Sequence, residues 1–263
     1  MVGGMSRRQA IAVGAAALTV GTRGGAGATP ARGAMKTIGV LGGLGPQATM
    51  DFEARAHRAA QRLIPPDMNH GYPPMVVYYY RHGPALLTPE GKPVVPHRPD
   101  PRLLEAARRL GSLADFLVIT SNSVHLLHAE IERAAGRRVL NMIEATLAEV
   151  RRRGWTRVGV LTLSRPVVYT QPLARDRIAC ETLDAEVQAA LDAAIFRVME
   201  GRDDAGSAAA ARRAVAALRA RGVDGVILGC TELPLLLRED AEAEDLINPG
   251  QLLAEAAVKL ALG

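Results

Sequence analysis

Short apolar runs alternate with amphipathic stretches along most of the chain after residue 35. Runs such as "TIGVL", "DFLVI" and "GVILG" are bounded by glycine or polar residues, which is typical of buried strands, and the stretches between them repeat apolar residues at helical spacing. Strands that alternate with helices predict a mainly parallel sheet covered by helices on both faces. Because the alternation starts again after Trp155, we expect an α/β protein with two such sheets.

The order of these elements suggests where two domains divide. We predict a first domain that comprises residues 35–147 together with residues 247–263, and a second that comprises residues 148–246. The chain has 263 residues, 48% of them hydrophobic, which is enough apolar surface for two domains with cores. A loop at residues 84–101 holds six prolines and cannot be a regular element, and long loops beside strand ends usually belong to sites.

Residues 1–34 differ from the rest of the chain and have the layout of an export signal. Arg7 and Arg8 precede a short apolar run, and Ala26 and Ala28 form an A-x-A cleavage pattern. The paired arginines indicate the twin-arginine route, which would place the protein in the periplasm or outside the cell. The apolar run is shorter than the ~20 residues of a membrane span, so we expect no stable membrane insertion after signal removal. A start that is not a true signal would leave the protein in the cytoplasm.

Charge and aromatic content argue against nucleic acid as a partner. The formal charge falls from +5 to +1 without the four arginines of residues 1–34, and only one Trp and three Phe are available for base stacking. The two cysteines, Cys180 and Cys230, are too few for a disulfide framework. Cys180 has no partner motif and is expected to be an inert thiol.

Two turns look like copies of one another. "VITSNSVHLL" at residues 118–127 and "VILGCTELPLL" at residues 226–236 each contain an apolar run, a small polar cluster and a helix start. The second turn has Cys230 where the first has Ser121. A thiol at a helix N-terminus meets backbone N–H groups and a positive dipole end, so we expect its pKa to be lowered from about 8.5. A buried core cysteine is the alternative.

Other motifs are weaker. Gly43 and Gly45 fit the start of a dinucleotide-binding turn, but Pro46 removes one N–H from the phosphate cradle. We favour a tight turn whose backbone approaches a small ligand, which makes Gly43 a candidate substrate-binding residue. No cluster of carboxylates or thiols accompanies His125 and His128, so we expect packed or capping histidines and no metal site.

Five segments in order resemble the aspartate/glutamate racemase family, in particular its aspartate racemase branch: "KTIGVLGGLGPQAT", "SNSVH", "NMIEAT", "ILGCTELPLLL" and "INPGQLLAEAAVKLAL". They extend over nearly the whole chain after Met35. The resemblance implies two pseudo-symmetric domains that face each other across a cleft with the active site. It also implies a small-molecule amino acid or dicarboxylate as substrate, no cofactor, and a common tendency to form homodimers.

The resemblance further implies a two-sided proton transfer. In this family one cysteine from each domain flanks the substrate Cα; one thiolate removes the α-proton and the other thiol returns a proton on the opposite face. Cys230 and Ser121 are therefore the candidate catalytic residues. By position, Asn122, Ser123 and Thr231 are the candidate residues for binding the α-carboxylate.

The chain departs from the family pattern at several positions. Ser121 stands where the family has a cysteine, and an alcohol is too weak an acid to serve as an ordinary general base near neutral pH. Tyr79 and Tyr80 stand where the family has asparagine. Arg165 or Arg81 is then a candidate partner for an anionic group of the substrate.

Three functions remain open from the sequence. The first is a cofactor-independent amino-acid racemase with Cys230 as base and Ser121 as a weak or relay acid, faster from one enantiomer than from the other. The second is a one-thiol decarboxylase or isomerase on the same scaffold, in which Cys230 acts on one face only. The third is a periplasmic amino-acid-binding protein that has kept the cleft without turnover.

Overall fold

Two four-stranded parallel sheets organise the part of the chain that the computed structural model describes, namely residues 35–65, 71–90, 93–164, 166–202 and 204–263. The strand order is β2-β1-β3-β4 in the first sheet and β6-β5-β7-β8 in the second, so one topology occurs twice. The strands are β1 (Ile38–Gly42), β2 (Met75–Tyr79), β3 (Phe116–Ile119), β4 (Val139–Leu140), β5 (Arg157–Leu161), β6 (Ala179–Glu181), β7 (Gly225–Leu228) and β8 (Leu246–Ile247). The predicted α/β fold with two parallel sheets is confirmed.

Two predictions concern residues that the structure does not describe, and a third concerns membrane insertion. The predicted export signal at residues 1–34 and the candidate residue Arg165 lie outside the described residues. Within the described ranges, no helix is both long and apolar enough to cross a membrane.

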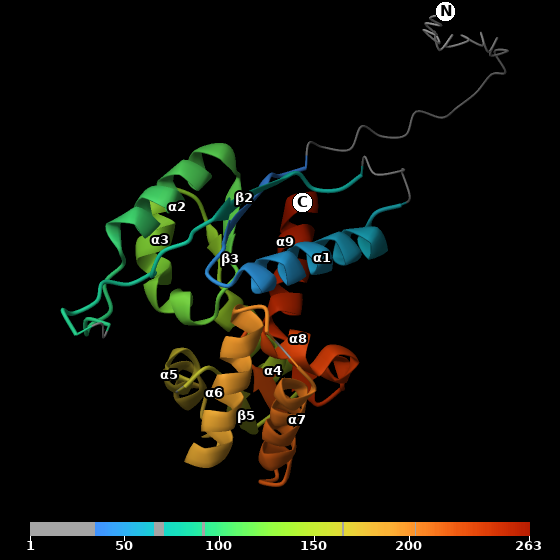
Figure 1. The fold of residues 1–263 in the computed structure, drawn as a ribbon. Coiled ribbons are helices and arrows are strands. Elements are labelled where there is room, and N and C mark those ends of the chain that lie inside the picture. The colour runs from blue at the N-terminus through green and yellow to red at the C-terminus, as the bar shows by residue number, and fades with distance from the viewer. Residues whose placement is uncertain (1–34, 66–70, 91–92, 165, 203) are drawn as a thin grey trace, which may run out of the picture. The chain divides into compact units, whose positions relative to one another are not determined.

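Helices cover both faces of each sheet, as Figure 1 shows for the first sheet, with α2 and α3 on one side and α1 and α9 on the other. The α-helices are α1 (Pro46–Leu63), α2 (Pro101–Leu113), α3 (His128–Ala135), α4 (Met142–Arg152), α5 (Val167–Arg175), α6 (Ala185–Met199), α7 (Ala205–Arg219), α8 (Leu233–Leu237) and α9 (Pro249–Leu262). Two short 3-10 helices, η1 (Ser123–Leu127) and η2 (Arg238–Glu242), follow β3 and α8. Because of this cover, every residue of β1, β3 and β7 is buried, which explains their unbroken apolar sequences.

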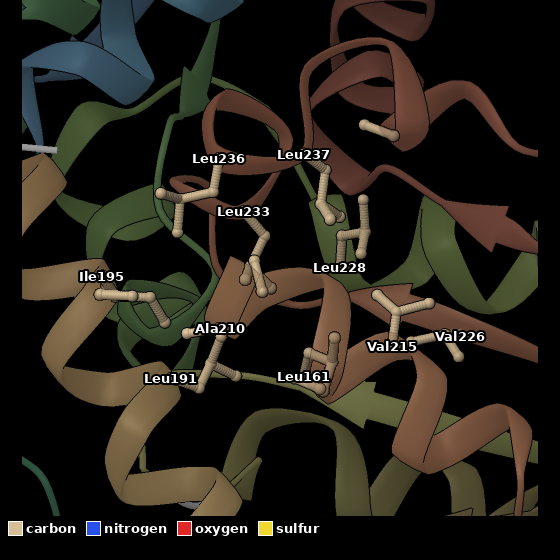
Figure 2. Close-up of a cluster of buried hydrophobic side chains, with 14 of the residues drawn as sticks. Leu161, Leu191, Ile195, Ala210, Val215, Val226, Leu228, Leu233, Leu236 and Leu237 are labelled. Atoms are coloured by element: carbon tan, nitrogen blue, oxygen red, sulfur yellow. The ribbon is translucent and has the colours of Figure 1, made fainter. Parts of the chain in front are cut away.

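The core of the second sheet illustrates the packing (Figure 2). Leucine and valine side chains of β5 and β7 meet leucine, isoleucine and alanine side chains of α6, α7 and α8. The opposite face of this sheet packs against α4 and α5, where Tyr169 and Leu173 are fully buried. The central strands β5 and β7 are therefore packed against helices on both faces.

The two halves exchange helices. Helix α4 follows the first sheet in the chain but packs on the second, through Leu147 and Val150. Helix α9 follows the second sheet but packs on the first beside α1, through Leu253 and Val258. The predicted domain boundaries at 147 and 247 fall within α4 and at the end of β8, and the division into domains stays a prediction.

The starts of these exchanged helices are built alike. The Asn141 side chain caps α4 by accepting from the N–H groups of Ile143 and Glu144. The Asn248 side chain caps α9 by accepting from the N–H groups at positions 250 and 251. An asparagine N-cap satisfies donors that a helix leaves unpaired, so both crossings between the halves are fixed by the same local device.

Candidate active site

A cavity of about 350 Å³ lies where turns from the two sheets meet. Its walls come mainly from the segments that directly follow β1, β3, β5 and β7. These are the carboxyl ends of the two inner strands of each sheet, the usual place for a ligand in parallel α/β proteins. The lining residues are Leu44, Gly45, His97, Thr120, Ser121, Asn122, Ser123, Leu126, Thr162, Leu163, Ser164, Val167, Val168, Met199, Gly229, Cys230, Thr231 and Glu232. The fold thus brings five sequence-predicted residues together: Ser121, Asn122, Ser123, Cys230 and Thr231.

The first turn presents an amide to this cavity. Asn122 is buried, and its Oδ1 accepts a hydrogen bond of 2.6 Å from the hydroxyl of Tyr169, which comes from the other half of the molecule. Its Nδ2 is buried and has no hydrogen-bond partner among the described residues. An unpaired buried donor costs free energy, so this amide is suited to an acceptor supplied by a ligand.

His125 holds the Ser121 turn in place. The Nε2 atom accepts from the N–H of Met142 at 3.1 Å, so Nδ1 carries the proton and donates to the Ser121 carbonyl at 2.8 Å. Burial is the main cause that lowers the pKa of His125, to about 4. The ring is therefore neutral at physiological pH with both nitrogens engaged. The expectation of a packed histidine is confirmed, and a proton relay through His125 to Ser121 is not supported by these hydrogen bonds.

The second turn joins a thiol to a carboxylate. The Cys230 Sγ donates to Oε2 of Glu232 at 3.1 Å, and the Thr231 hydroxyl donates to the same oxygen at 3.1 Å. Burial raises the pKa of the Cys230 thiol well above its ordinary value, and the charge and hydrogen bond of Glu232 raise it further. Backbone N–H groups act in the opposite direction with a smaller effect. The predicted lowering of this pKa is wrong, because a one-turn helix cannot offset burial beside a negative charge.

Glu232 is the functional residue that the sequence analysis missed. Its side chain is only 3% exposed, although it belongs to the second half and reaches the turn after β1 in the first. A Cβ at Gly45 would lie 2.5 Å from Glu232 Oε1, so the absence of a side chain at Gly45 makes room for the carboxylate. A single acidic residue within "VILGCTELPLLL" was the available signal, since glutamate is rarely buried without a role.

Gly43 has a structural task in the turn after β1, and its contact with substrate stays a prediction. It is not among the residues that line the cavity, and its N–H donates to Thr49 Oγ1 at 2.9 Å. Its φ of +79° favours glycine, and an added Cβ would lie 2.8 Å from the Tyr79 Cα. Gly43 lets the backbone pass close to β2, and the residues that the same turn contributes to the cavity are Leu44 and Gly45.

Tyr79, Tyr80 and Arg81, which also depart from the family pattern, are not among the residues that line the cavity. Tyr80 is buried and donates to the carbonyl of Gly83, whereas the exposed Tyr79 donates to Glu53. Arg81 is exposed at the carboxyl end of β2. Among the described residues, no group of three or more His, Cys, Asp or Glu side chains is arranged to hold a metal ion.

Comparison with known proteins agrees with this architecture. The sequence profile of the family described as Asp/Glu/Hydantoin racemase matches residues 41–257. The chain belongs to this family. The match begins within β1 and covers every later strand and both candidate catalytic turns.

Individual relatives are distant. An uncharacterized protein in the pnlA 3' region of Pectobacterium carotovorum subsp. carotovorum is 32% identical over 105 residues, which are 39% of this chain and 69% of that protein. The broad specificity amino-acid racemase RacX of Bacillus subtilis (strain 168) is 26% identical over 116 residues, 43% of this chain. That match spans about half of RacX, 48% of its length. The crystal structure of Picrophilus torridus aspartate racemase superposes with a TM-score of 0.69 at 21% identity, over 86% of this chain and 94% of that one, and shows a shared fold.

Proposed function

We propose that the protein is a cofactor-independent amino-acid racemase that removes and returns the α-proton of its substrate. The observation that carries the proposal is the meeting of two equivalent turns, with Cys230 from one and Ser121 from the other, at a single cavity. Family membership and the broad specificity racemase among the relatives support the same reaction class. Inversion at a carbon needs proton carriers on opposite faces, and a duplicated half-molecule provides two such positions.

Proton removal is assigned to the Cys230 side. The thiol is protonated at rest because its pKa is raised, and its hydrogen already points to Glu232. Transfer of that proton to the Glu232 carboxylate leaves a thiolate, which takes the α-proton as the C–H bond breaks and a new S–H bond forms. Glu232 is in this scheme the group that activates the thiol.

The electron pair left on Cα needs stabilisation by the substrate carboxylate. The Thr231 hydroxyl already donates to Glu232 Oε2, so we assign that carboxylate to the unpaired Nδ2 of Asn122 and the hydroxyl group of Ser123, which line the same cavity. Hydrogen bonds to the carboxylate strengthen as charge moves onto its oxygens, so these donors favour the carbanion over the ground state. Tyr169 fixes the Asn122 amide from behind and orients Nδ2.

Proton return on the other face is assigned to Ser121. Its hydroxyl gives a proton to Cα and recovers one from water, while the proton on Glu232 returns to solvent, so the protons balance over a turnover. A serine hydroxyl is a much weaker acid than a thiol, so this half of the reaction is slow. The proposal therefore requires unequal rates from the two enantiomers.

Exchange in D₂O tests the proposal. We expect one enantiomer to exchange its α-hydrogen for deuterium well before inversion is detected, and its mirror image to exchange at least about tenfold more slowly, as positioned acid–base groups differ by such factors. The measurement is the initial rate of α-exchange by proton NMR for both enantiomers of each amino acid. Equal exchange rates, or no exchange from any amino acid that binds, would contradict a racemase of this design.

A second candidate function is favoured by one observation. The Cys230 thiol is protonated and, among the described lining residues, shares the cavity with the alcohol of Ser121 and no second thiol, which suits protonation of one face only. In a decarboxylation of a substituted malonate, the bond from Cα to one carboxylate breaks, CO₂ leaves, and the thiol protonates the resulting carbanion. Release of CO₂ from malonates without α-exchange from amino acids would favour this one-thiol decarboxylase. Binding of amino acids with neither reaction would favour a binding protein.

A further inference from the structure

Part of the cavity lining is apolar. Six aliphatic or thioether side chains from four separate segments form it: Leu44, Leu126, Leu163, Val167, Val168 and Met199. Leu126 is 40% exposed and Val167 is 50% exposed, so both residues present apolar surface to water. A ligand with an apolar side chain would remove that surface from water, at about a fourfold gain in affinity for each buried methylene.

The polar part of the lining includes one unpaired amide donor and one carboxylate. Asn122 Nδ2 is the one buried lining donor without a partner among the described residues. The Glu232 carboxylate lies in the same cavity and would repel a second carboxylate placed near it. Of the described residues that line the cavity, none is lysine or arginine, and His97 from the proline-rich loop is the one histidine.

We infer that the substrate has one carboxylate at the reacting carbon and an apolar side chain of the size of leucine, methionine or phenylalanine, in place of the second carboxylate of aspartate or glutamate. The inference rests on the proposed function, because it places the reacting carbon beside Cys230. The volume of about 350 Å³ suits a small molecule of this size. The six apolar residues then determine specificity, and Asn122 orients the ligand.

The first experiment compares ligands on the wild-type protein. Calorimetric titration with both enantiomers of leucine, methionine, phenylalanine, aspartate and glutamate should show the apolar acids binding at least about tenfold more tightly, the equivalent of two buried methylenes. Aspartate or glutamate binding as tightly as leucine would overturn the inference, as would failure of every apolar acid to bind. If dicarboxylates bind and Arg165→Ala abolishes that binding, the second carboxylate is recognised by Arg165 and the inference is wrong.

Two variants of helix α5 test whether Val167 determines the preference for apolar over acidic ligands. Val167→Arg places a guanidinium at the half-exposed edge of the cavity, and we expect it to weaken leucine binding and strengthen aspartate binding, each by about tenfold, through an ion pair at the site. Gln171→Arg is the matched control, since Gln171 is exposed on the same helix α5 and does not line the cavity. An equal effect of both variants would overturn the assignment of Val167 to specificity.

Failure of the inference and failure of the proposed function give different results. The same set of amino acids is assayed for α-exchange in D₂O. Apolar acids that bind tightly without exchange would contradict the racemase and leave the substrate class standing. Exchange from aspartate or glutamate alone would support the racemase and overturn the substrate class.

Discussion

The turn after β3 and the turn after β7 occupy equivalent places in two sheets of the same topology, yet they are held by different chemistry. In the first, a neutral buried imidazole bonds to the Ser121 carbonyl and leaves the alcohol without an adjacent charged group on its own turn. In the second, a buried carboxylate bonds directly to the reactive side chain of Cys230. The polar contact of the first turn holds its backbone, whereas that of the second turn joins a thiol to a carboxylate.

This difference shows that a duplicated fold does not have to keep two equal active groups. The two turns have equivalent positions in the fold because each follows a fully buried central strand. The acid–base strength at each place depends on a few side chains that packing does not require. The predictions below alter one turn at a time and ask how far their roles differ.

The largest effect is expected from the reactive thiol. Cys230→Ala should lower α-exchange by about 10³-fold or more, because it removes the thiol to which proton removal is assigned. The fold should be retained, since alanine is smaller and the site borders a cavity. Exchange rates by proton NMR and a thermal unfolding curve measure the two properties. Cys180→Ala is the control, and an equal loss in both variants would mean that a different property of the thiols is being removed.

Next in size is the pH dependence of stability that His125 creates. Its pKa is about 4 in the folded chain against 6.5 in the unfolded chain, so between these values only the unfolded chain binds the proton. The free energy of unfolding should therefore fall as the pH is lowered from 6.5 to about 4, by about 3 kcal/mol from this group. Urea unfolding of the wild type and of His125→Gln over this range gives the difference.

His57→Gln, at an exposed position of α1, serves as the control for removal of a histidine. A His125→Gln protein with the same slope against pH as the wild type would show that the imidazole of the first turn is not held neutral by the fold.

The carboxylate of the second turn is expected to matter slightly less than the thiol. Glu232→Gln keeps the size and an acceptor but removes the charge, so α-exchange should fall by about 10²-fold. The pKa of the Cys230 thiol should also fall, because the negative charge that raises it is gone. The pH dependence of alkylation by iodoacetamide reports this shift. Gly45→Ala, which crowds the Glu232 Oε1, should act in the same direction on exchange and more weakly.

Glu239→Gln at an exposed position of η2 controls for the loss of one acidic residue. If Glu232→Gln exchanges protons as fast as the wild type, Glu232 does not activate the thiol, and the two turns differ only in the nucleophilic atom.

The smallest effect is expected from making the two turns alike. Ser121→Cys should raise the rate of inversion by about tenfold and bring the exchange rates of the two enantiomers closer, since both faces then have a thiol. The gain is limited because the first turn has His125 where the second has Glu232, so the new thiol lacks a carboxylate to activate it. Ser123→Cys in the same turn is the control. Faster exchange without any change in the ratio of enantiomers would contradict the two-sided arrangement.

Much of this structure follows from local patterns in the sequence. The alternation of strands and helices, the restart after Trp155 and the doubled turns all depend on apolar periodicity, which is written in the chain itself. Ser121, Asn122, Ser123, Cys230 and Thr231 could be placed at strand ends on that basis, and parallel strands bring their carboxyl ends together.

Tertiary structure alone decided the electrostatics of the site. The thiol pKa is raised, not lowered, because burial and Glu232 outweigh the backbone dipoles, and burial depends on residues far apart in the chain. Likewise, the Glu232 carboxylate reaches the space beside Gly45 only when the two halves are packed together. The same packing brings the Tyr169 hydroxyl to Asn122 Oδ1, while Asn122 Nδ2 stays unpaired. Periodicity determines which residues reach the cavity, whereas the free energy of a proton there depends on every charge and dipole that folding places around it.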